Sequence, residues 1–113
     1  MLTLKELEDF GVKTKEGLTR CMNNEAFYFK MIKMGLSNEY FDKLSATLAA
    51  GDLAESFEAA HALKGVMGNL ALAPLYDPLA ELTELLRAHK EADYVTLYEP
   101  IKEARDKLLA LCN

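Results

Sequence analysis

Helical periodicity, with no strand-like alternation, is the feature that most restricts the fold of this chain. Leu, Ala, Glu and Lys dominate the sequence, so helix propensity is high nearly throughout. No segment combines β-branched residues with the period-two alternation that indicates a strand. The length of 113 residues fits one domain, residues 1–113, with a single core. The sequence therefore predicts an all-α, single-domain protein.

Capping residues and glycines divide the chain into helices. Thr3 and Glu6 can form a capping box for a short helix that stops before Gly11. Thr14 is predicted to cap a second short helix that reaches about residue 22. Asn23 or Asn24 is predicted to cap a longer helix that reaches residue 48, with a break or bend near 35–37, and Asp52 is predicted to cap a helix over 53–69. Further helices are predicted over 77–89 and over 93–111. An earlier start for the helix over 77–89, at residue 72, is the alternative.

Four longer helices with short connections predict an up-and-down four-helix bundle with one or two short additional N-terminal helices. Asp77 followed by Pro78 is a good N-cap and first-turn pair for the third helix. If that helix begins earlier, Pro74 would lie in its first turn and Pro78 would kink it. The Met and aromatic stripe within 27–41 is expected to lie in the bundle core.

The segment 60–70 places an unusual set of residues on one helical face. At about 100° per residue, Lys64, Gly65 and Gly68 fall within roughly 60° of His61. Glycine inside a helix costs about 1 kcal/mol relative to alanine, so something other than helix stability selects two of them here. Clearance for the surface of another protein is the simplest reason. Close packing between helices is the alternative.

The apolar residues of the same helix point away from His61. Their arc is centred roughly 140° from the histidine, again at about 100° per residue. They are Leu53, Ala60, Leu63, Met67 and Leu70. Such an arc packs inward in an amphipathic helix and leaves His61 in solvent. A hydrogen-bonded core histidine is the alternative.

Phe57 lies one turn before His61. Its position fits equally the edge of the core and an apolar contact patch for a partner.

Composition excludes several classes of function. The net charge is −5 with Lys and Arg interspersed among the acids, so no basic stripe for nucleic acid is present. No run of about 18 apolar residues could span a membrane. Cys21 and Cys112 match no disulfide framework or metal motif. The first residues lack the regions of a signal peptide. A cytoplasmic, monomeric protein with no metal site is expected.

The segment around His61 resembles the signature of histidine-containing phosphotransfer (HPt) domains. The matching residues are Ala60, His61, Leu63, Lys64 and Gly65, then Asn69 and Leu70, with Leu75, Gly51, Asp52, Gly17 and Leu18 in the flanking pattern. The resemblance implies a helical bundle in which His61 is exposed midway along a helix and is phosphorylated. It also implies no autokinase activity, and the chain has no Gly-rich phosphate loop. No cofactor is implied; Mg²⁺ is expected on the partner receiver domain.

Two positions depart from the pattern of that family. Members often have glycine where this chain has Ala71, near the end of the histidine helix. Many carry Gln or Glu on the following helix, hydrogen-bonded to the imidazole nitrogen that is not phosphorylated. Continuous counting places Thr83 there. A threonine hydroxyl is shorter, and Glu84 or a water could take its place.

The chemistry of these residues suits phosphoryl transfer. A neutral imidazole is a good nucleophile, and its ordinary pKa near 6.5 leaves it mostly neutral at cytoplasmic pH. Lys64, one turn away, can offset charge on the equatorial phosphoryl oxygens; a solvated surface lysine is the alternative. Gly65, Gly68 and Phe57 are predicted to form the docking face for a receiver.

The resulting hypothesis is a phosphorelay carrier that exchanges phosphoryl groups with aspartates of response-regulator receiver domains or of a hybrid histidine kinase. A receiver-binding adaptor or inhibitor that transfers nothing is the alternative. A structural bundle with a chance motif is a third. An enzyme with its own substrate pocket is disfavoured, because no carboxylate pair or nucleophile–base constellation is evident.

Overall fold

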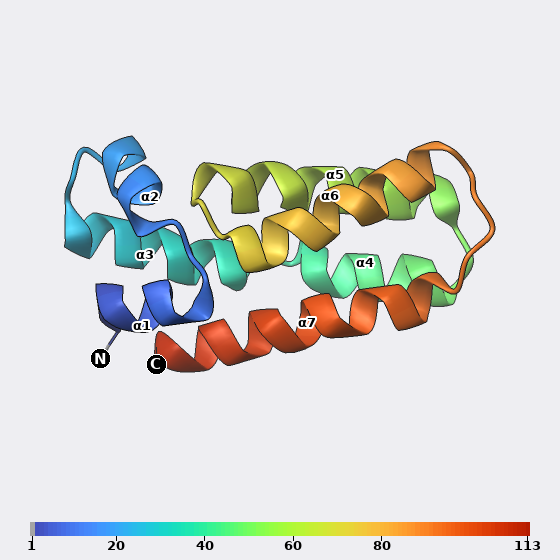
Figure 1. The fold of residues 1–113 in the computed structure, drawn as a ribbon. Helices are drawn as coiled ribbons and strands as arrows, with labels where there is room; N and C mark the ends of the chain where they lie inside the picture. The colour runs from blue at the N-terminus through green and yellow to red at the C-terminus, as the bar shows by residue number, and fades with distance from the viewer. Residues whose placement is uncertain (1) are drawn as a thin grey trace.

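The computed structural model describes residues 2–113, and this part of the chain is built of helices without any strand (Figure 1). The helices are α1 (Leu4–Phe10), α2 (Thr14–Arg20), α3 (Glu25–Leu36), α4 (Tyr40–Ala49), α5 (Leu53–Asn69), α6 (Ala73–Arg87) and α7 (Tyr94–Leu111). The all-α prediction is confirmed. No helix in this part of the chain has both the length and the apolar character needed to cross a bilayer.

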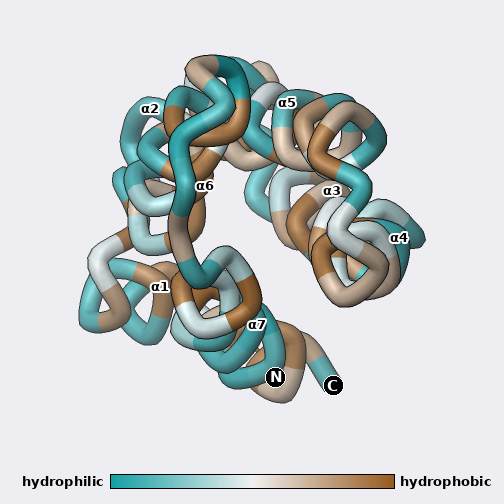
Figure 2. The backbone as a smooth tube through the Cα atoms, turned by 90° about the vertical axis from the view of Figure 1, so that its right-hand side faces the viewer, coloured by the Kyte–Doolittle hydropathy of each residue, from teal (hydrophilic) through white to brown (hydrophobic). Residues whose placement is uncertain are grey.

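Helices α3 to α7 form an elongated bundle, and the described chain as a whole measures 41 × 23 × 21 Å. Helices α3 and α4 follow one another nearly end to end and together make one side of it (Figure 1). The sides then succeed one another in chain order: α4 packs on α5, α5 on α6, α6 on α7, and α7 returns to α3 and α4. Figure 2 looks along this bundle and shows the helices around a shared interior. The predicted up-and-down bundle is confirmed.

The two short N-terminal helices pack at the end of the bundle that holds the start of α3 (Figure 1). The backbone N–H of Lys13 donates to the carbonyl of Ala71, 3.1 Å away, just after α5. The buried hydroxyl of Tyr28, in α3, donates to the carbonyl of Leu70 at 2.7 Å. The first bond joins the segment between α1 and α2 to the end of α5, and the second joins α3 to it.

The break between α3 and α4 falls at residues 37–39. The hydroxyl of Ser37 donates to the carbonyl of Lys33, and the side chain of Asn38 accepts from the N–H of Tyr40. The Asn38 side chain thus satisfies a backbone N–H that a continuous helix would pair, whereas the Lys33 carbonyl also keeps its helical bond from the N–H of Ser37. Gly35 lies within α3, where a Cβ would come 2.7 Å from Leu70, so it serves close packing and not the break.

Most predicted helix starts are confirmed, because their caps are local in sequence. Thr3 forms the capping box with Glu6. Asn24 accepts from the N–H of Phe27, and Asp52 accepts from the N–H of Glu55. The ends of α5 were also predicted correctly.

Two predicted caps are wrong. Helix α6 begins at Ala73 with Pro74 in its first turn and Pro78 inside it, as the alternative start requires, so Asp77 is not its N-cap. Thr14 is the first residue of α2 and not its cap. Its buried hydroxyl donates instead to the carboxylate of Glu8 at 2.9 Å, joining α1 to α2.

The core is formed by Leu, Ile, Met and aromatic side chains from every helix of the bundle. Within the stripe at 27–41, Tyr28, Ile32 and Phe41 are fully buried or nearly so. Phe27 and Met34 are 43% and 57% exposed, so the expectation that the whole stripe lies in the core is only partly correct. Residues 27 and 34 project from a different face of α3 than Tyr28 and Ile32, and this face is turned to solvent.

Candidate functional site

Helix α5 buries one face and presents the other to solvent, as its periodicity predicts. Ala60, Leu63 and Met67 are fully buried against the rest of the bundle. His61 is exposed, near the middle of the helix. The predicted exposure of His61 is confirmed, and the alternative of a core histidine is excluded.

The imidazole of His61 is held by aromatic stacking. Its ring lies 5.7 Å from the ring of Phe57, centroid to centroid, and the planes differ by 17°. The guanidinium carbon of Arg87, on α6, lies 5.1 Å from the centroid of the Phe57 ring. Arg87 also pairs with Glu84 at 3.4 Å. The imidazole makes no hydrogen bond to any residue from 2 to 113.

Lys64 and Gly65 follow His61 on the exposed side of α5. Lys64 is half-buried and Gly65 is exposed. A Cβ placed on Gly65 would have no atom within 4 Å outside its own helix backbone. The backbone beside His61 is therefore bare and accessible, as clearance for an approaching surface requires.

Gly68 differs from Gly65. A Cβ at Gly68 would come 2.9 Å from the ring of Tyr76, on α6. The Tyr76 ring takes up the space beside Gly68, so this glycine leaves less clearance than Gly65, and its place in a docking face stays a prediction. Close packing between α5 and α6, the alternative, explains this glycine.

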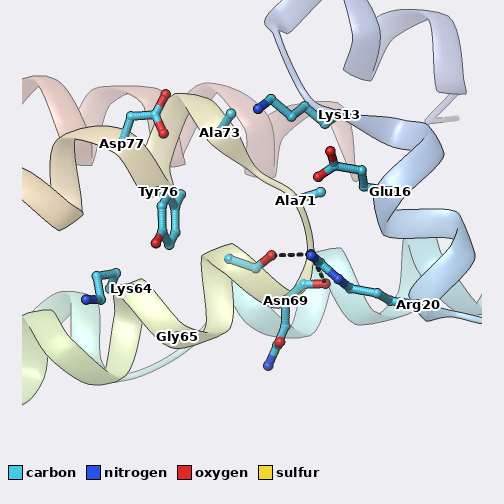
Figure 3. Close-up of a pocket in the computed structure, with 11 residues that line it drawn as sticks. Lys13, Glu16, Arg20, Lys64, Gly65, Asn69, Ala71, Ala73, Tyr76 and Asp77 are labelled. Carbon is cyan, nitrogen blue, oxygen red and sulfur yellow. Dashed lines mark hydrogen bonds between the residues drawn. The ribbon is translucent and has the colours of Figure 1, made fainter.

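A cleft of about 410 Å³ lies next to Lys64 and Gly65, between α2, α5 and α6 (Figure 3). Its walls carry Lys13, Glu16 and Arg20 from the N-terminal region, and Tyr76 and Asp77 from α6. Arg20 donates from Nη1 to the carbonyl of Gly68 at 2.6 Å, which closes one end of the cleft.

Sequence reasoning missed this cleft. Lys13, Glu16 and Arg20 lie far from Lys64 in the sequence, and no motif connects them. The docking of α2 on the end of α5 brings them together. Only a tertiary contact of this kind could have shown the cleft.

The predicted imidazole-orienting role of Thr83 is wrong. Thr83 is fully buried, and its hydroxyl donates to the carbonyl of Leu79 within α6 at 2.6 Å. It makes no hydrogen bond to the imidazole of His61. The carboxylate of Glu84, the other side chain considered, pairs with Arg87.

Ala71 takes the left-handed backbone conformation, with φ 59°, in the turn that follows α5. Glycine adopts this conformation without steric cost, and alanine does not. The turn therefore keeps the geometry that glycine would favour.

Neither cysteine forms a disulfide: Cys21 is buried and Cys112 is half-buried, and both are free thiols. Burial raises the pKa of the Cys112 thiol. Among residues 2–113, no cluster of three or more His, Cys, Asp or Glu side chains could hold a metal ion.

Comparison with known proteins identifies the family. A family model described as the Hpt domain matches residues 35–112, which include the end of α3 and all of α4 to α7. No curated protein and no solved structure gave a match to the chain. The matched segment covers more than half of the chain and contains His61, Lys64 and Gly65. The chain therefore belongs to the Hpt domain family, whose members carry phosphoryl groups in two-component signalling.

Proposed function

We propose that His61 accepts a phosphoryl group from a phospho-aspartate of a receiver domain and returns it to the aspartate of another. The observation that carries this proposal is an exposed imidazole, free of hydrogen bonds to described residues, beside a lysine and a bare stretch of backbone at Gly65. A receiver can approach such a face without displacing any side chain of α5.

The transfer is a displacement at phosphorus. The lone pair of one imidazole nitrogen forms the new P–N bond as the P–O bond to the aspartate breaks, and the aspartate leaves as a carboxylate. Phosphoryl transfer passes through a loose transition state with charge on three equatorial oxygens, so positioning and electrostatics dominate. Lys64 supplies a positive charge one turn from His61. The receiver supplies the Mg²⁺. This chain contributes no cofactor and has no autokinase activity.

The partners under this proposal are receiver domains of response regulators, or of a hybrid histidine kinase. We place this single-domain monomer in the cytoplasm, acting on neither nucleic acid nor membranes. The acidic balance, with its dispersed cations, supports this choice of partner class over polyanions.

A labelling experiment tests the proposal. The chain is incubated with a receiver domain carrying ³²P on its aspartate, and the product is checked for label that is acid-labile and base-stable, as a P–N bond requires. We expect wild-type protein to be labelled and His61→Gln to remain unlabelled. Lys64→Gln is expected to be labelled about tenfold more slowly, which corresponds to about 1.4 kcal/mol in the transition state.

The outcomes separate transfer from simple binding. Label that persists in His61→Gln refutes His61 as the acceptor. Binding of the receiver without label on the wild-type chain favours the alternative of an adaptor or inhibitor. His89→Gln is a matched control, because His89 is the other histidine of the chain and is also exposed.

A further inference from the structure

We infer that Phe57 is a positioning residue: its ring fixes the plane of the His61 imidazole for reaction. This inference rests on the proposed function and adds a role for a side chain that the sequence left undecided between core and partner contact. The 17° angle between the two ring planes and the 5.7 Å between their centroids describe a stack, one helical turn apart.

Phe57 is itself held in place from two sides. It is half-buried and packs against the hydrophobic core of the bundle. On α6, the guanidinium of Arg87 lies 5.1 Å from the ring centroid, and Arg87 is paired with Glu84. A ring fixed in this way offers a rigid platform, whereas an isolated exposed phenylalanine would change rotamer freely.

The stack takes the place of a hydrogen bond. No residue from 2 to 113 bonds to the imidazole nitrogens, and the hydroxyl of Thr83 on the facing helix is used by Leu79. Without a hydrogen bond, the stack with Phe57 is the contact that we infer restricts rotation of the exposed ring. Stacking fixes the plane and leaves both ring nitrogens unbonded to residues 2–113.

The size of the effect follows from the rotamers that stacking removes. A helical histidine has about two accessible χ1 wells and a broad, roughly two-fold χ2, so about four orientations compete. Selecting one of them raises the reactive population by at most about fourfold. Loss of the stack is therefore expected to slow phosphorylation of His61 two- to fourfold, where fourfold is about the largest effect that these rotamers allow.

The test uses phosphoramidate, a small donor that needs no docking surface. The imidazole nitrogen forms a bond to phosphorus while the P–N bond of phosphoramidate breaks and ammonia leaves. Phe57→Leu keeps an apolar side chain without a flat ring, and Phe57→Tyr keeps the ring. Phe27→Leu is the matched control, since Phe27 is a partly exposed phenylalanine on α3.

We expect Phe57→Leu to be labelled about two- to fourfold more slowly, within the limit set by the rotamers. Phe57→Tyr and Phe27→Leu should be labelled at the wild-type rate. Unchanged labelling of Phe57→Leu by phosphoramidate, with slower labelling by a phosphorylated receiver, would make Phe57 a docking contact and overturn the inference. Equal slowing in Phe57→Leu and Phe57→Tyr would also overturn it, because the ring would not be the cause.

Proton NMR of the unphosphorylated wild-type protein provides a measurement that does not depend on any variant folding. The stack predicts upfield-shifted ring protons for His61 and nuclear Overhauser effects between them and the ring of Phe57. Their absence overturns the inference. If the stack is present and the wild-type chain takes label from neither donor, the proposed function fails, and the positioning role fails with it. If the wild-type chain is labelled and Phe57→Leu matches it with both donors, the inference fails alone.

Discussion

Replacing Gly65 by alanine is expected to stabilise the protein and to weaken its exchange with a receiver. The added methyl group would meet no atom within 4 Å beyond its own helix backbone, so it would introduce no strain. Alanine is favoured over glycine in a helix interior by about 1 kcal/mol. Gly65 lies four residues before the end of α5 on an exposed face, so propensity alone should decide the change in stability.

The corresponding shift in melting temperature can be estimated from the length of the chain. Unfolding entropy is about 2.1 cal/mol/K per residue, and for 113 residues a gain of about 1 kcal/mol raises Tm by about 4 °C. Thermal unfolding followed by circular dichroism at a helix band measures this shift. Urea unfolding of the same variant should move the midpoint upward with an unchanged m-value.

Gly17→Ala is the matched control. Gly17 is buried in α2, and a Cβ there would overlap the ring and hydroxyl of Tyr28, which bonds to Leu70. Overpacking of this kind typically costs about 1–3 kcal/mol, so the same substitution should destabilise here. Opposite signs at the two glycines would confirm that local clearance determines the effect.

The functional half of the prediction separates docking from chemistry. Gly65→Ala should be labelled by phosphoramidate at the wild-type rate and by a phosphorylated receiver more slowly. A loss of stability in Gly65→Ala would refute the structural reasoning. Equal labelling by the receiver would refute the assignment of Gly65 to the docking face.

Two further predictions concern the contacts that α2 and α3 make with the end of α5. Tyr28→Phe should destabilise by about 1–2 kcal/mol in urea, because the buried carbonyl of Leu70 loses its donor. Burial raises the pKa of Tyr28 to about 12. The contribution of Tyr28 to the free energy of unfolding should therefore be fully present below about pH 10, where the unfolded tyrosine begins to ionise, and should be lost as the pH rises toward 12. Tyr28→Phe should show a shallower fall in stability over the same pH range. Arg20→Ala should accelerate hydrogen exchange of α2 amides with little change in global stability, since its bond to the Gly68 carbonyl is exposed; unchanged exchange would show that Arg20 does not hold α2.

The central part of the site could be predicted from sequence because it depends on one helix. The phase of α5 follows from its own apolar residues, so the burial of Leu63 and Met67 and the exposure of His61 could be read without knowledge of neighbouring helices. The cap at Asp52 is equally local. Features fixed within a single helix are those that a single sequence reveals best.

Features that depend on neighbouring helices could not be predicted. Gly65 and Gly68 look alike in sequence, and only the position of Tyr76 on α6 distinguishes them. The role of Thr83 failed for the same reason, because counting along the chain places a residue opposite His61 without showing that it is buried. Likewise, the start of α6 depended on which of two prolines occupied its first turn.

The docking of the N-terminal region on the end of α5 affects how this module could be transplanted. The family match begins at residue 35, yet the carbonyls at the end of α5 are paired with Arg20 and Tyr28. A chimera spliced at the edge of the match would leave those carbonyls and the nearby core side chains uncovered. The packed core therefore extends upstream of the segment that the family model matches, and fusion junctions belong before α1.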